Sequence, residues 1–277
     1  MKTFCLYLTI LLISFSNHIC AQYYYRDIVS ITQANNEMNN YKKAGFKNIK
    51  IKSIDPNGEE SIDFFCEKKI AKDYRKTSLY TRTGNEGKSL MESFFDKNGL
   101  LIKTYDSSDL VVLKNEFVYN EKKMLIKTSS FSRSNDDDFI NENLEIHLYH
   151  YNDSGLPTNL YRIKNNSDTT MILFSIDENN NIAIEKDTKN GSKYYYYYDE
   201  SNRLTDIVHT NEFKQKLIAD YVFEYNDEGQ INQMTTTEDG IDNFTVWKYD
   251  FENNLKVKER IFDKNGMLIG KIIYEYK

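Results

Sequence analysis

From about residue 90 to the C-terminus, apolar and polar residues alternate over short stretches, which is the pattern of β-strands with one buried face. Polar turns rich in Asp, Asn and Gly separate these stretches at short intervals. No segment of this region has the three-to-four-residue apolar period of an amphipathic helix, and strands without intervening helices argue against a parallel α/β sheet. The pattern predicts an all-β fold.

The turns follow one seven-position pattern: an aromatic residue, Asp or Asn, two variable residues, Gly or Asn, one variable residue, and an aliphatic residue. Eight copies begin at Phe95, Tyr119, Tyr151, Ile176, Tyr198, Tyr225, Tyr249 and Phe262. A hairpin loop made of a type I turn plus one left-handed residue needs this chemistry, because Asp or Asn bonds the backbone two residues on and Gly or Asn tolerates positive φ. In the copy at Tyr225, the pattern predicts that Tyr225 and Ile231 face each other across the hairpin.

Residues 1–21 have the organisation of a signal peptide. Lys2 is followed by an apolar run from Phe4 to Phe15, which is too short to span a bilayer as a helix, and Ala21 offers a cleavage site. Cleavage there would leave Gln22 at the new N-terminus, where it could cyclise. No later apolar run reaches the length of a transmembrane helix. We therefore expect an exported protein, periplasmic or extracellular.

Cys20 raises an alternative to plain cleavage, namely lipidation at a bacterial lipobox and attachment to the outer membrane. That motif requires a small residue before the cysteine, and Ile19 occupies the position. Plain cleavage would leave Cys66 as the lone cysteine, which we interpret as a small buried hydrophobe rather than a reactive thiol.

A different pattern occupies residues 26–44, where four apolar residues recur near helical spacing: Ile28, Ile31, Met38 and Tyr41. Ala44-Gly45 would end this helix, and a strand would follow at 49–54. We expect the short helix to cover a sheet edge, because exposed edges invite aggregation. The expected organisation is a signal peptide at 1–21, an N-terminal helix and lead-in strand at 22–53, and a β-hairpin repeat domain at 54–277. The repeats would form an elongated, twisted meander sheet of antiparallel hairpins.

The repeated pattern resembles the YD repeat of the bacterial RHS family over roughly residues 90–277. The segment from Tyr198 to Thr205 (YDESNRLT) is the most similar to that repeat, followed by the copy at Tyr225. The resemblance implies long β-hairpin sheets, which in that family sometimes close into shells. This chain has fewer repeats, uneven spacing and no C-terminal toxin region, so we expect a small envelope or secreted relative without a closed shell.

Composition and motif searches narrow the function without naming it. A formal net charge of −6 disfavours capture of nucleic acid, and we expect no such partner. The sequence has no signature of a zinc protease, a thiol redox enzyme, a serine hydrolase or a nucleotide-binding protein. His147 and His150 would lie on opposite faces of a strand, which is poor geometry for a shared metal. The acidic run at residues 136–138 is interpreted as a solvated loop. We expect no catalytic residues, no metal and no cofactor.

The tyrosine run at 194–198 is the candidate binding feature. Strand alternation places Tyr194, Tyr196 and Tyr198 on one face. Tyrosine combines a flat apolar ring with a polar tip, which suits stacking on a sugar or a peptide. The alternative is that these rings pack within the sheet.

The sequence thus favours an exported, non-enzymatic β-repeat binding or scaffold protein of the bacterial envelope, whose partner is a glycan or another protein. One alternative is a carbohydrate-active enzyme with catalytic carboxylates on its loops. A further alternative is a purely structural element.

Overall fold

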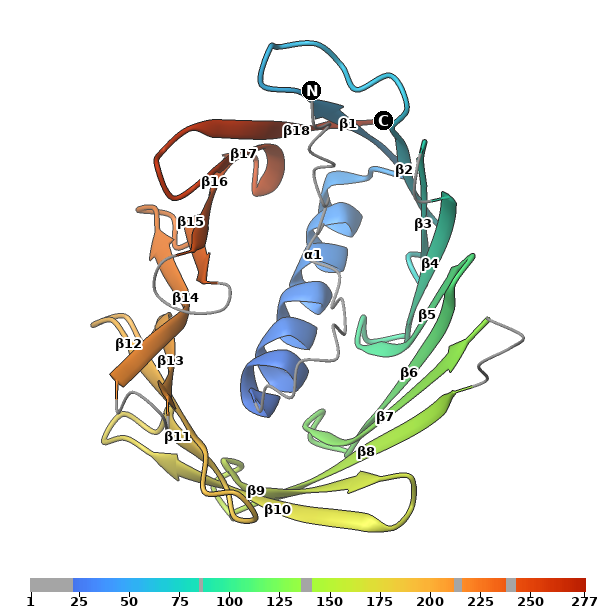
Figure 1. Cartoon of the computed structure of the whole chain (residues 1–277). Coiled ribbons are helices and arrows are strands. Elements are labelled where there is room, and N and C mark those ends of the chain that lie inside the picture. The colour runs from blue at the N-terminus through green and yellow to red at the C-terminus, as the bar shows by residue number, and fades with distance from the viewer. Residues whose placement is uncertain (1–21, 85–86, 136–140, 212–215, 238–242) are drawn as a thin grey trace.

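The computed structural model describes residues 22–84, 87–135, 141–211, 216–237 and 243–277, and in these the chain forms a closed antiparallel β-barrel of 18 strands around one helix (Figure 1). The elements are η1 (Tyr24–Val29), α1 (Ser30–Ala44), β1 (Asn48–Ile54), β2 (Phe65–Ile70), β3 (Lys76–Thr83), β4 (Gly87–Phe95), β5 (Leu101–Ser108), β6 (Val111–Tyr119), β7 (Leu125–Ser134), β8 (Glu142–Tyr151), β9 (Pro157–Lys164), β10 (Asp168–Ile176), β11 (Ile182–Asp187), β12 (Lys193–Tyr198), β13 (Leu204–Asn211), β14 (Lys216–Tyr225), β15 (Ile231–Thr237), β16 (Phe244–Glu252), β17 (Leu255–Phe262) and β18 (Leu268–Tyr276).

The all-β prediction is confirmed, but the prediction of an open, elongated meander sheet is wrong. Each strand pairs with its neighbours in the sequence, and β1 pairs with both β2 and β18. Ile51, for example, lies opposite Cys66 on one side and Tyr274 on the other. Closure satisfies the backbone groups that a free edge strand would leave unpaired. β1 is a strand of the barrel wall, so the expected boundary at residue 54 falls inside that wall.

The turn chemistry predicted from the repeats is present. In the β4–β5 turn, Asp96 Oδ1 accepts hydrogen bonds from the backbone N–H groups of Asn98 at 2.8 Å and Leu100 at 2.9 Å, and Gly99 has a φ of 80°. The ladder shifts register next to Tyr225, which lies opposite Ile231 as predicted. The repeat therefore encodes a bulged hairpin turn.

The tyrosine that begins several repeats also fastens one hairpin to the preceding one. Its hydroxyl donates to the main-chain carbonyl of a residue 16 to 26 positions earlier. The bonds run from Tyr119 to Leu101, from Tyr151 to Leu125, from Tyr198 to Ile182 and from Tyr225 to Leu204, at 2.6–2.9 Å. In all four bonds, the accepting residue is the first residue of the strand that follows a turn. The tyrosine that begins one repeat is therefore bonded to the aliphatic residue that ends the preceding repeat.

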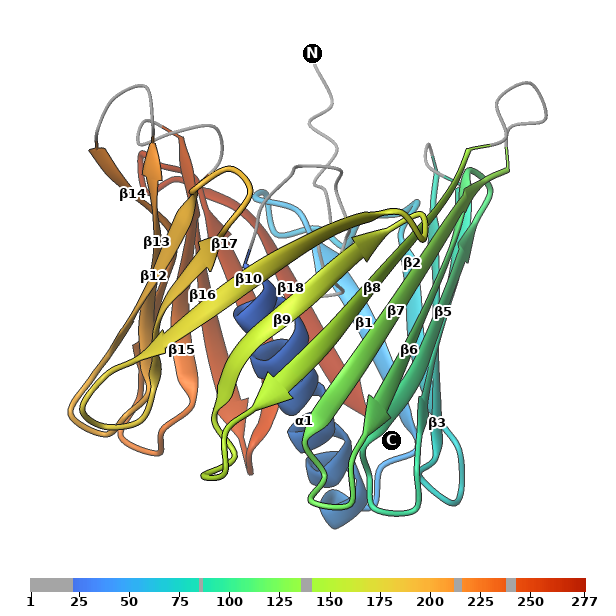
Figure 2. The ribbon, with the colours of Figure 1, turned by 90° about the horizontal axis from the view of Figure 1, so that it is seen from below.

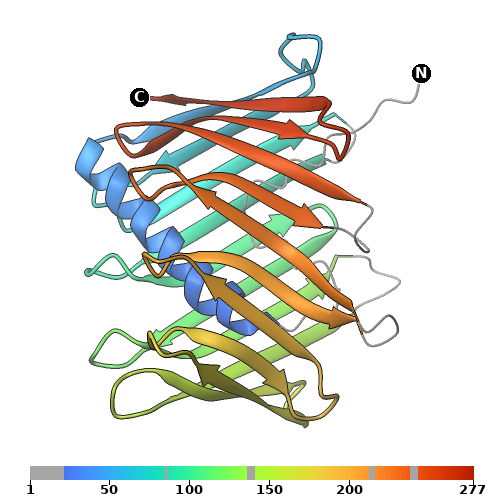
Figure 3. The same ribbon diagram turned by 90° about the vertical axis from the view of Figure 1, so that its left-hand side faces the viewer.

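The predicted N-terminal helix is confirmed, but its expected position at a sheet edge is wrong. α1 ends at Ala44 and is capped by Gly45, whose φ is 83° and whose N–H donates to Tyr41 O at 2.9 Å. Ile31, Met38 and Tyr41 are each no more than 3% exposed. The helix slants across the interior of the barrel (Figures 2 and 3), and a closed barrel has no edge to cover.

Barrel size explains why a helix fills the interior. About eight strands give an interior that their own side chains can fill, whereas 16 to 18 strands leave a wide lumen. Here η1 and α1 occupy that lumen and pack against inward-facing side chains from both halves of the wall. Leu160, Ile172, Ile207 and Ile272 are among the inward-facing residues with 0% exposure. The hydrophobic core is therefore the inside of the barrel.

The outer wall is strongly charged on one side. Outward-facing residues of β16, β17, β18 and β1 include Asp250, Arg260, Glu275 and Lys52. Arg260 pairs with Asp250 at 2.7 Å, and Lys52 pairs with Glu275 at 2.7 Å. In the described part of the chain, no helix has both the length and the apolar character needed to cross a membrane.

Candidate functional site

The three tyrosines predicted as a binding stripe face the interior of the barrel. Tyr194 is 6% exposed and Tyr196 is 3% exposed, and Tyr198 is half-buried. The Tyr24 ring packs edge-on against Tyr196, with ring centroids 5.3 Å apart. The strand alternation was correct, but this face is the inner one, so these rings are packing groups of the core here and are not presented to a partner in solvent.

Glu185 of β11 anchors the N-terminal end of the helical segment. Its carboxylate accepts hydrogen bonds from the backbone N–H groups of Tyr23 at 3.1 Å and Tyr24 at 3.0 Å, and from the hydroxyl of Tyr196 at 2.9 Å. The first N–H groups of a helix lack partners within the helix, and a carboxylate there also interacts favourably with the helix dipole. Burial raises the pKa of Glu185 even though these donors oppose the shift.

Asp27 and His147 form a second anchor, between η1 and β8. The Asp27 carboxylate bonds His147 Nδ1 and accepts from the Tyr149 hydroxyl at 2.9 Å. His147 Nε2 lies 2.8 Å from Glu145 Oε1, and Arg26 contacts both carboxylates, at 3.5 Å and 3.4 Å. Asp27 is 6% exposed and His147 is 1% exposed, so this pair is buried, whereas Arg26 and Glu145 are half-buried at the edge of the cluster.

The charges in this cluster stabilise one another. Burial alone would lower the pKa of His147, but contacts with Asp27 and Glu145 raise it above the usual value. Burial opposes ionisation of Glu145, yet His147 and Arg26 lower its pKa to about 2. Because carboxylate oxygens face both ring nitrogens, the doubly protonated imidazolium donates a hydrogen bond to each carboxylate. The cluster is therefore an ion-paired anchor whose strength depends on pH.

We expect protein stability to decrease as the pH rises through the pKa of His147 in the folded protein. A folded-state pKa above the unfolded value contributes stability that is fully present below the unfolded pKa and is lost above the folded one. The unfolded value is near 6.5, so the loss should begin above that pH. Urea unfolding at successive pH values, compared with His147→Gln, checks this expectation. His209 beside Asp220 has the same direction of shift and remains in both proteins. An equal alkaline slope in the variant would contradict the assignment.

Arg162 ties the same end of the helical segment to β9 and β10. Its guanidinium donates to Tyr23 Oη at 2.7 Å and to Thr170 Oγ1 at 3.2 Å. Burial raises the pKa of Tyr23 to about 12. Tyr23 therefore stays neutral at physiological pH and acts as a hydrogen-bonding partner of the guanidinium.

These anchors were missed from the sequence, although a signal for one of them was present. His147 and His150 do lie on opposite faces, as predicted, with His147 inside the barrel and His150 exposed. An aromatic residue lies two positions before six of the eight repeats and faces inward, as Tyr149 does. His147 lies two residues before Tyr149 on the same face. A charged or polar residue on a face marked as inward therefore indicates a buried network.

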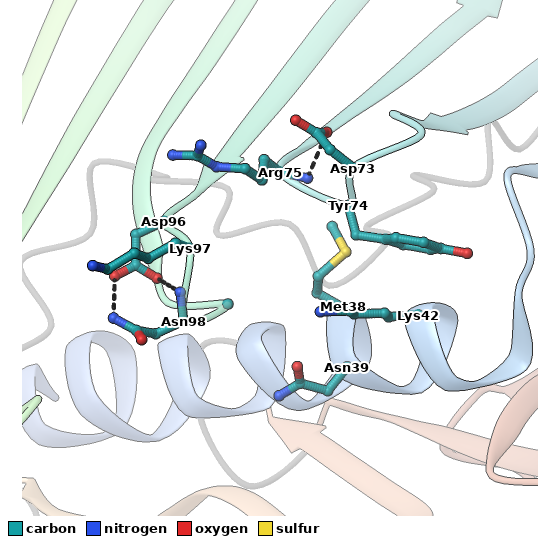
Figure 4. A pocket seen from close by; sticks show the side chains of 10 residues that line it. Met38, Asn39, Lys42, Asp73, Tyr74, Arg75, Asp96, Lys97 and Asn98 are labelled. Atoms are coloured by element: carbon teal, nitrogen blue, oxygen red, sulfur yellow. Dashed lines mark hydrogen bonds between the residues drawn. The ribbon is translucent and has the colours of Figure 1, made fainter.

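A pocket of about 210 Å³ lies where the C-terminal half of α1 meets two hairpin turns (Figure 4). It is lined by Met38, Asn39 and Lys42 of α1, by Asp73, Tyr74 and Arg75 of the β2–β3 turn, and by Asp96, Lys97, Asn98 and Gly99 of the β4–β5 turn. A Cβ atom at Gly99 would lie 3.1 Å from Asn39 Oδ1, so glycine allows the turn to approach the helix. The pocket therefore lies at the junction between the helix and the wall of the barrel.

The remaining predictions concern the cysteines and a metal site. Cys66 is 1% exposed, and burial raises its thiol pKa, so its assignment as a small buried hydrophobe is confirmed. Cys20, the signal peptide at 1–21 and the acidic run at 136–138 lie outside the described residues. Within the described ranges, no group of three or more His, Cys, Asp or Glu side chains has the arrangement of a metal site.

No protein-family model matches the chain, and no curated protein sequence is similar to it. Among solved structures, a crystal structure of TcdB2-TccC3-TEV is 10% identical, with a TM-score of 0.38 over 79% of this chain and 13% of that chain. A porin-like protein from Bacteroides uniformis is 9% identical, with a TM-score of 0.37 over 84% of this chain and 98% of its own. At these values the likeness concerns the β-rich fold alone, and the RHS resemblance stays a prediction.

Proposed function

We propose that this protein is an exported, non-enzymatic binding module of the bacterial envelope that holds another protein on the outer wall of β8, β9 and β10. Six of the apolar residues that point outward there adjoin one another: Ile146, Leu148, Tyr161, Ile163, Met171 and Leu173. Their neighbours in the sequence face inward, which fixes their direction. We call these six residues the outer apolar patch.

The ladder registers make the patch continuous. Ile146 lies opposite Ile163, and Leu148 lies opposite Tyr161, which lies opposite Met171 on its other side. Tyr161 is 37% exposed and Leu173 is 38% exposed. Contiguous apolar surface on a protein wall is typical of interaction sites, and a few such residues supply most of the binding energy in many interfaces.

Lysines on both flanks of the patch indicate the chemistry of the partner. Lys127 lies opposite Leu148, and Lys186 lies opposite Leu173. Among the described residues, neither lysine has an ion-pair partner. A partner with an apolar centre and flanking carboxylates complements this surface, whereas a second copy would bring the same lysines toward one another. The apolar centre offers few hydrogen bonds for a sugar, so a protein fits better than a glycan.

The charged half of the wall supports a water-facing barrel. A barrel that faces lipid carries an apolar band around its whole circumference, and charges at mid-height are costly there. Asp250, Arg260 and Lys52 lie on the outer wall away from the patch. Together with the signal-peptide pattern of residues 1–21, this supports residence in the periplasm or outside the cell.

The alternative of a carbohydrate-active enzyme has no support from the described turns. Asp177, Asp199 and Asp263 each accept hydrogen bonds from backbone N–H groups of their own turns. These contacts lower their pKa values even where burial opposes the shift, whereas a catalytic acid needs a raised one. Burial raises the pKa of Glu185 and of Asp106; Glu185 is 0% exposed beneath the helical segment, and Asp106 lies within β5 and not on a turn.

A photo-crosslinking experiment tests the proposal. With a photoreactive amino acid in place of Tyr161, illumination of native cells is expected to give one dominant adduct with another protein. The additional substitution Leu148→Asp should abolish the adduct, because it places a charge within the patch. Ile273, an outward apolar residue of β18 among charged neighbours, is the matched control position. Equal crosslinking from position 273, or adducts with a second copy only, would contradict the proposal.

A further inference from the structure

We propose that the chain cyclises its own mature N-terminus, with Asp220 of β14 catalysing the closure of Gln22 to pyroglutamate and His209 of β13 as the proton donor to Asp220. The proposal rests on the cleavage after Ala21 that the sequence predicts. Each molecule reacts once, on its own chain, so this step is a maturation of the protein. It is independent of the outer apolar patch and of the proposed protein partner.

The side-chain amide of Gln22 is bound to a carboxylate of the barrel wall. Gln22 Nε2 donates a hydrogen bond to Asp220 Oδ2 at 2.8 Å, and Gln22 is 9% exposed. The main-chain carbonyl of Gln22 accepts from the Arg26 N–H at 2.9 Å, in the first turn of the helical segment. Both the side chain and the backbone of residue 22 therefore have fixed partners. The nitrogen that must leave during cyclisation is the one that contacts Asp220.

His209 contacts the same carboxylate oxygen. Its Nδ1 lies 2.9 Å from Asp220 Oδ2. This hydrogen bond raises the pKa of His209 above its usual value, so the imidazole holds a proton over more of the neutral range. The side chain of His209 is 29% exposed, which lets it exchange protons with water. The other titratable group in contact with it among the described residues is Tyr194 of β12, with ring centroids 5.7 Å apart.

Cyclisation forms one bond and breaks another. The α-amine nitrogen of Gln22 attacks Cδ of its own side chain, the Cδ–Nε2 bond breaks, and Nε2 leaves as ammonia. The attacking nitrogen loses one proton and the departing nitrogen gains one, so the reaction needs no oxidant, reductant or other co-reactant. Asp220 passes a proton from His209 to the departing nitrogen, and the proton lost by the amine returns to His209 through water. A positioned general acid accelerates such a step by about 10²–10⁴-fold.

The reaction needs a neutral amine and a protonated imidazole at the same time. The neutral amine becomes more abundant as the pH approaches the ordinary α-amino pKa of about 7.7–8.0. The protonated imidazole becomes scarcer as the pH rises through the pKa of His209. We therefore expect the rate in the folded chain to rise and then to fall with pH. The unfolded chain lacks the contact between Asp220 and His209, so its rate should rise with pH without the fall.

Intact-mass measurements on the chain from Gln22 to Lys277 test the proposal. The chain is made with a removable N-terminal fusion, and a protease that cleaves directly before Gln22 starts the reaction at a known time. Loss of the mass of one ammonia reports cyclisation. We expect the folded chain to cyclise at least about tenfold faster than the same chain unfolded in urea. The protein purified from native cells is expected to begin with pyroglutamate at position 22.

Substitutions identify the groups that act. Asp220→Asn is expected to remove the acceleration, because an amide does not pass a proton to Nε2. His209→Gln should slow the reaction and remove the fall at high pH. Glu224→Gln, at an exposed position of the same strand, should keep the rate within about twofold. Tyrosine fluorescence checks that each variant is folded.

Equal rates in the folded and the unfolded wild-type chain would overturn the proposal without reference to any variant. So would an unchanged rate in folded Asp220→Asn, or a native protein that keeps a free amine at Gln22.

Discussion

Replacing Asp27 with alanine is expected to lower the free energy of unfolding by about 3–5 kcal/mol, the usual consequence of removing one partner from a buried ion pair. The substitution removes the carboxylate that pairs with His147 Nδ1 and leaves the Tyr149 hydroxyl only its 3.2 Å hydrogen bond to Tyr23 O. Burial then favours neutral His147, and Arg26 loses one of its two carboxylates. Urea unfolding monitored by tyrosine fluorescence measures the loss.

Two controls separate the anchor from a general effect of substitution. Asp227→Ala, at an exposed turn position, is expected to change stability by no more than about 0.5 kcal/mol. The double variant Asp27→Ala with His147→Ala should lose less than the sum of the single variants, because the pair acts as a unit. If Asp27→Ala does not fold, Asp27→Asn is measured in its place. A loss below about 1 kcal/mol would show that the pair does not anchor the helical segment.

A disulfide across the seam of the barrel is expected to raise the free energy of unfolding by about 4–5 kcal/mol, the chain-entropy value for so long a loop. Lys50 and Glu275 lie directly opposite each other on β1 and β18, far apart in the sequence. Lys50→Cys combined with Glu275→Cys should therefore oxidise readily, while buried Cys66 stays reduced. Faster migration on non-reducing gels and urea unfolding with and without reductant measure the effect.

The matched control pairs Lys50→Cys with Lys127→Cys, whose position is on β7, away from the seam. That pair should not form an intramolecular disulfide, because the two Cα atoms are not cross-strand neighbours. Failure of the Lys50–Glu275 pair to oxidise would mean that β1 and β18 are not joined in solution.

Local structure followed from sequence because it depends on neighbouring residues. The turn at Tyr225 was predictable, since Asn226 and Gly229 have the side-chain and backbone chemistry of one specific loop, and Gly229 has the expected positive φ of 78°. The end of α1 at Ala44, with Gly45 as its cap, was predictable for the same reason.

The binding-site prediction shows what pattern reading leaves open. Alternation correctly grouped Tyr194, Tyr196 and Tyr198 on one face, but alternation gives no information on whether that face is the inside or the outside of a sheet. Tyr197, on the opposite face, is 47% exposed. The contacts of Tyr196 with Tyr24 and Glu185 show that this face is the inner one.

The sequence by itself determined the strands, the bulged turns, the helix and its end, because each depends on chemistry within a few residues. Only the tertiary structure decided that β1 meets β18, that the helix lies within the lumen, and that Asp27, Glu185 and Arg162 have their present partners. Those contacts join residues far apart in the chain, and their free energy depends on the twist and closure of all 18 strands together. A pattern within a few residues of the sequence does not determine that free energy.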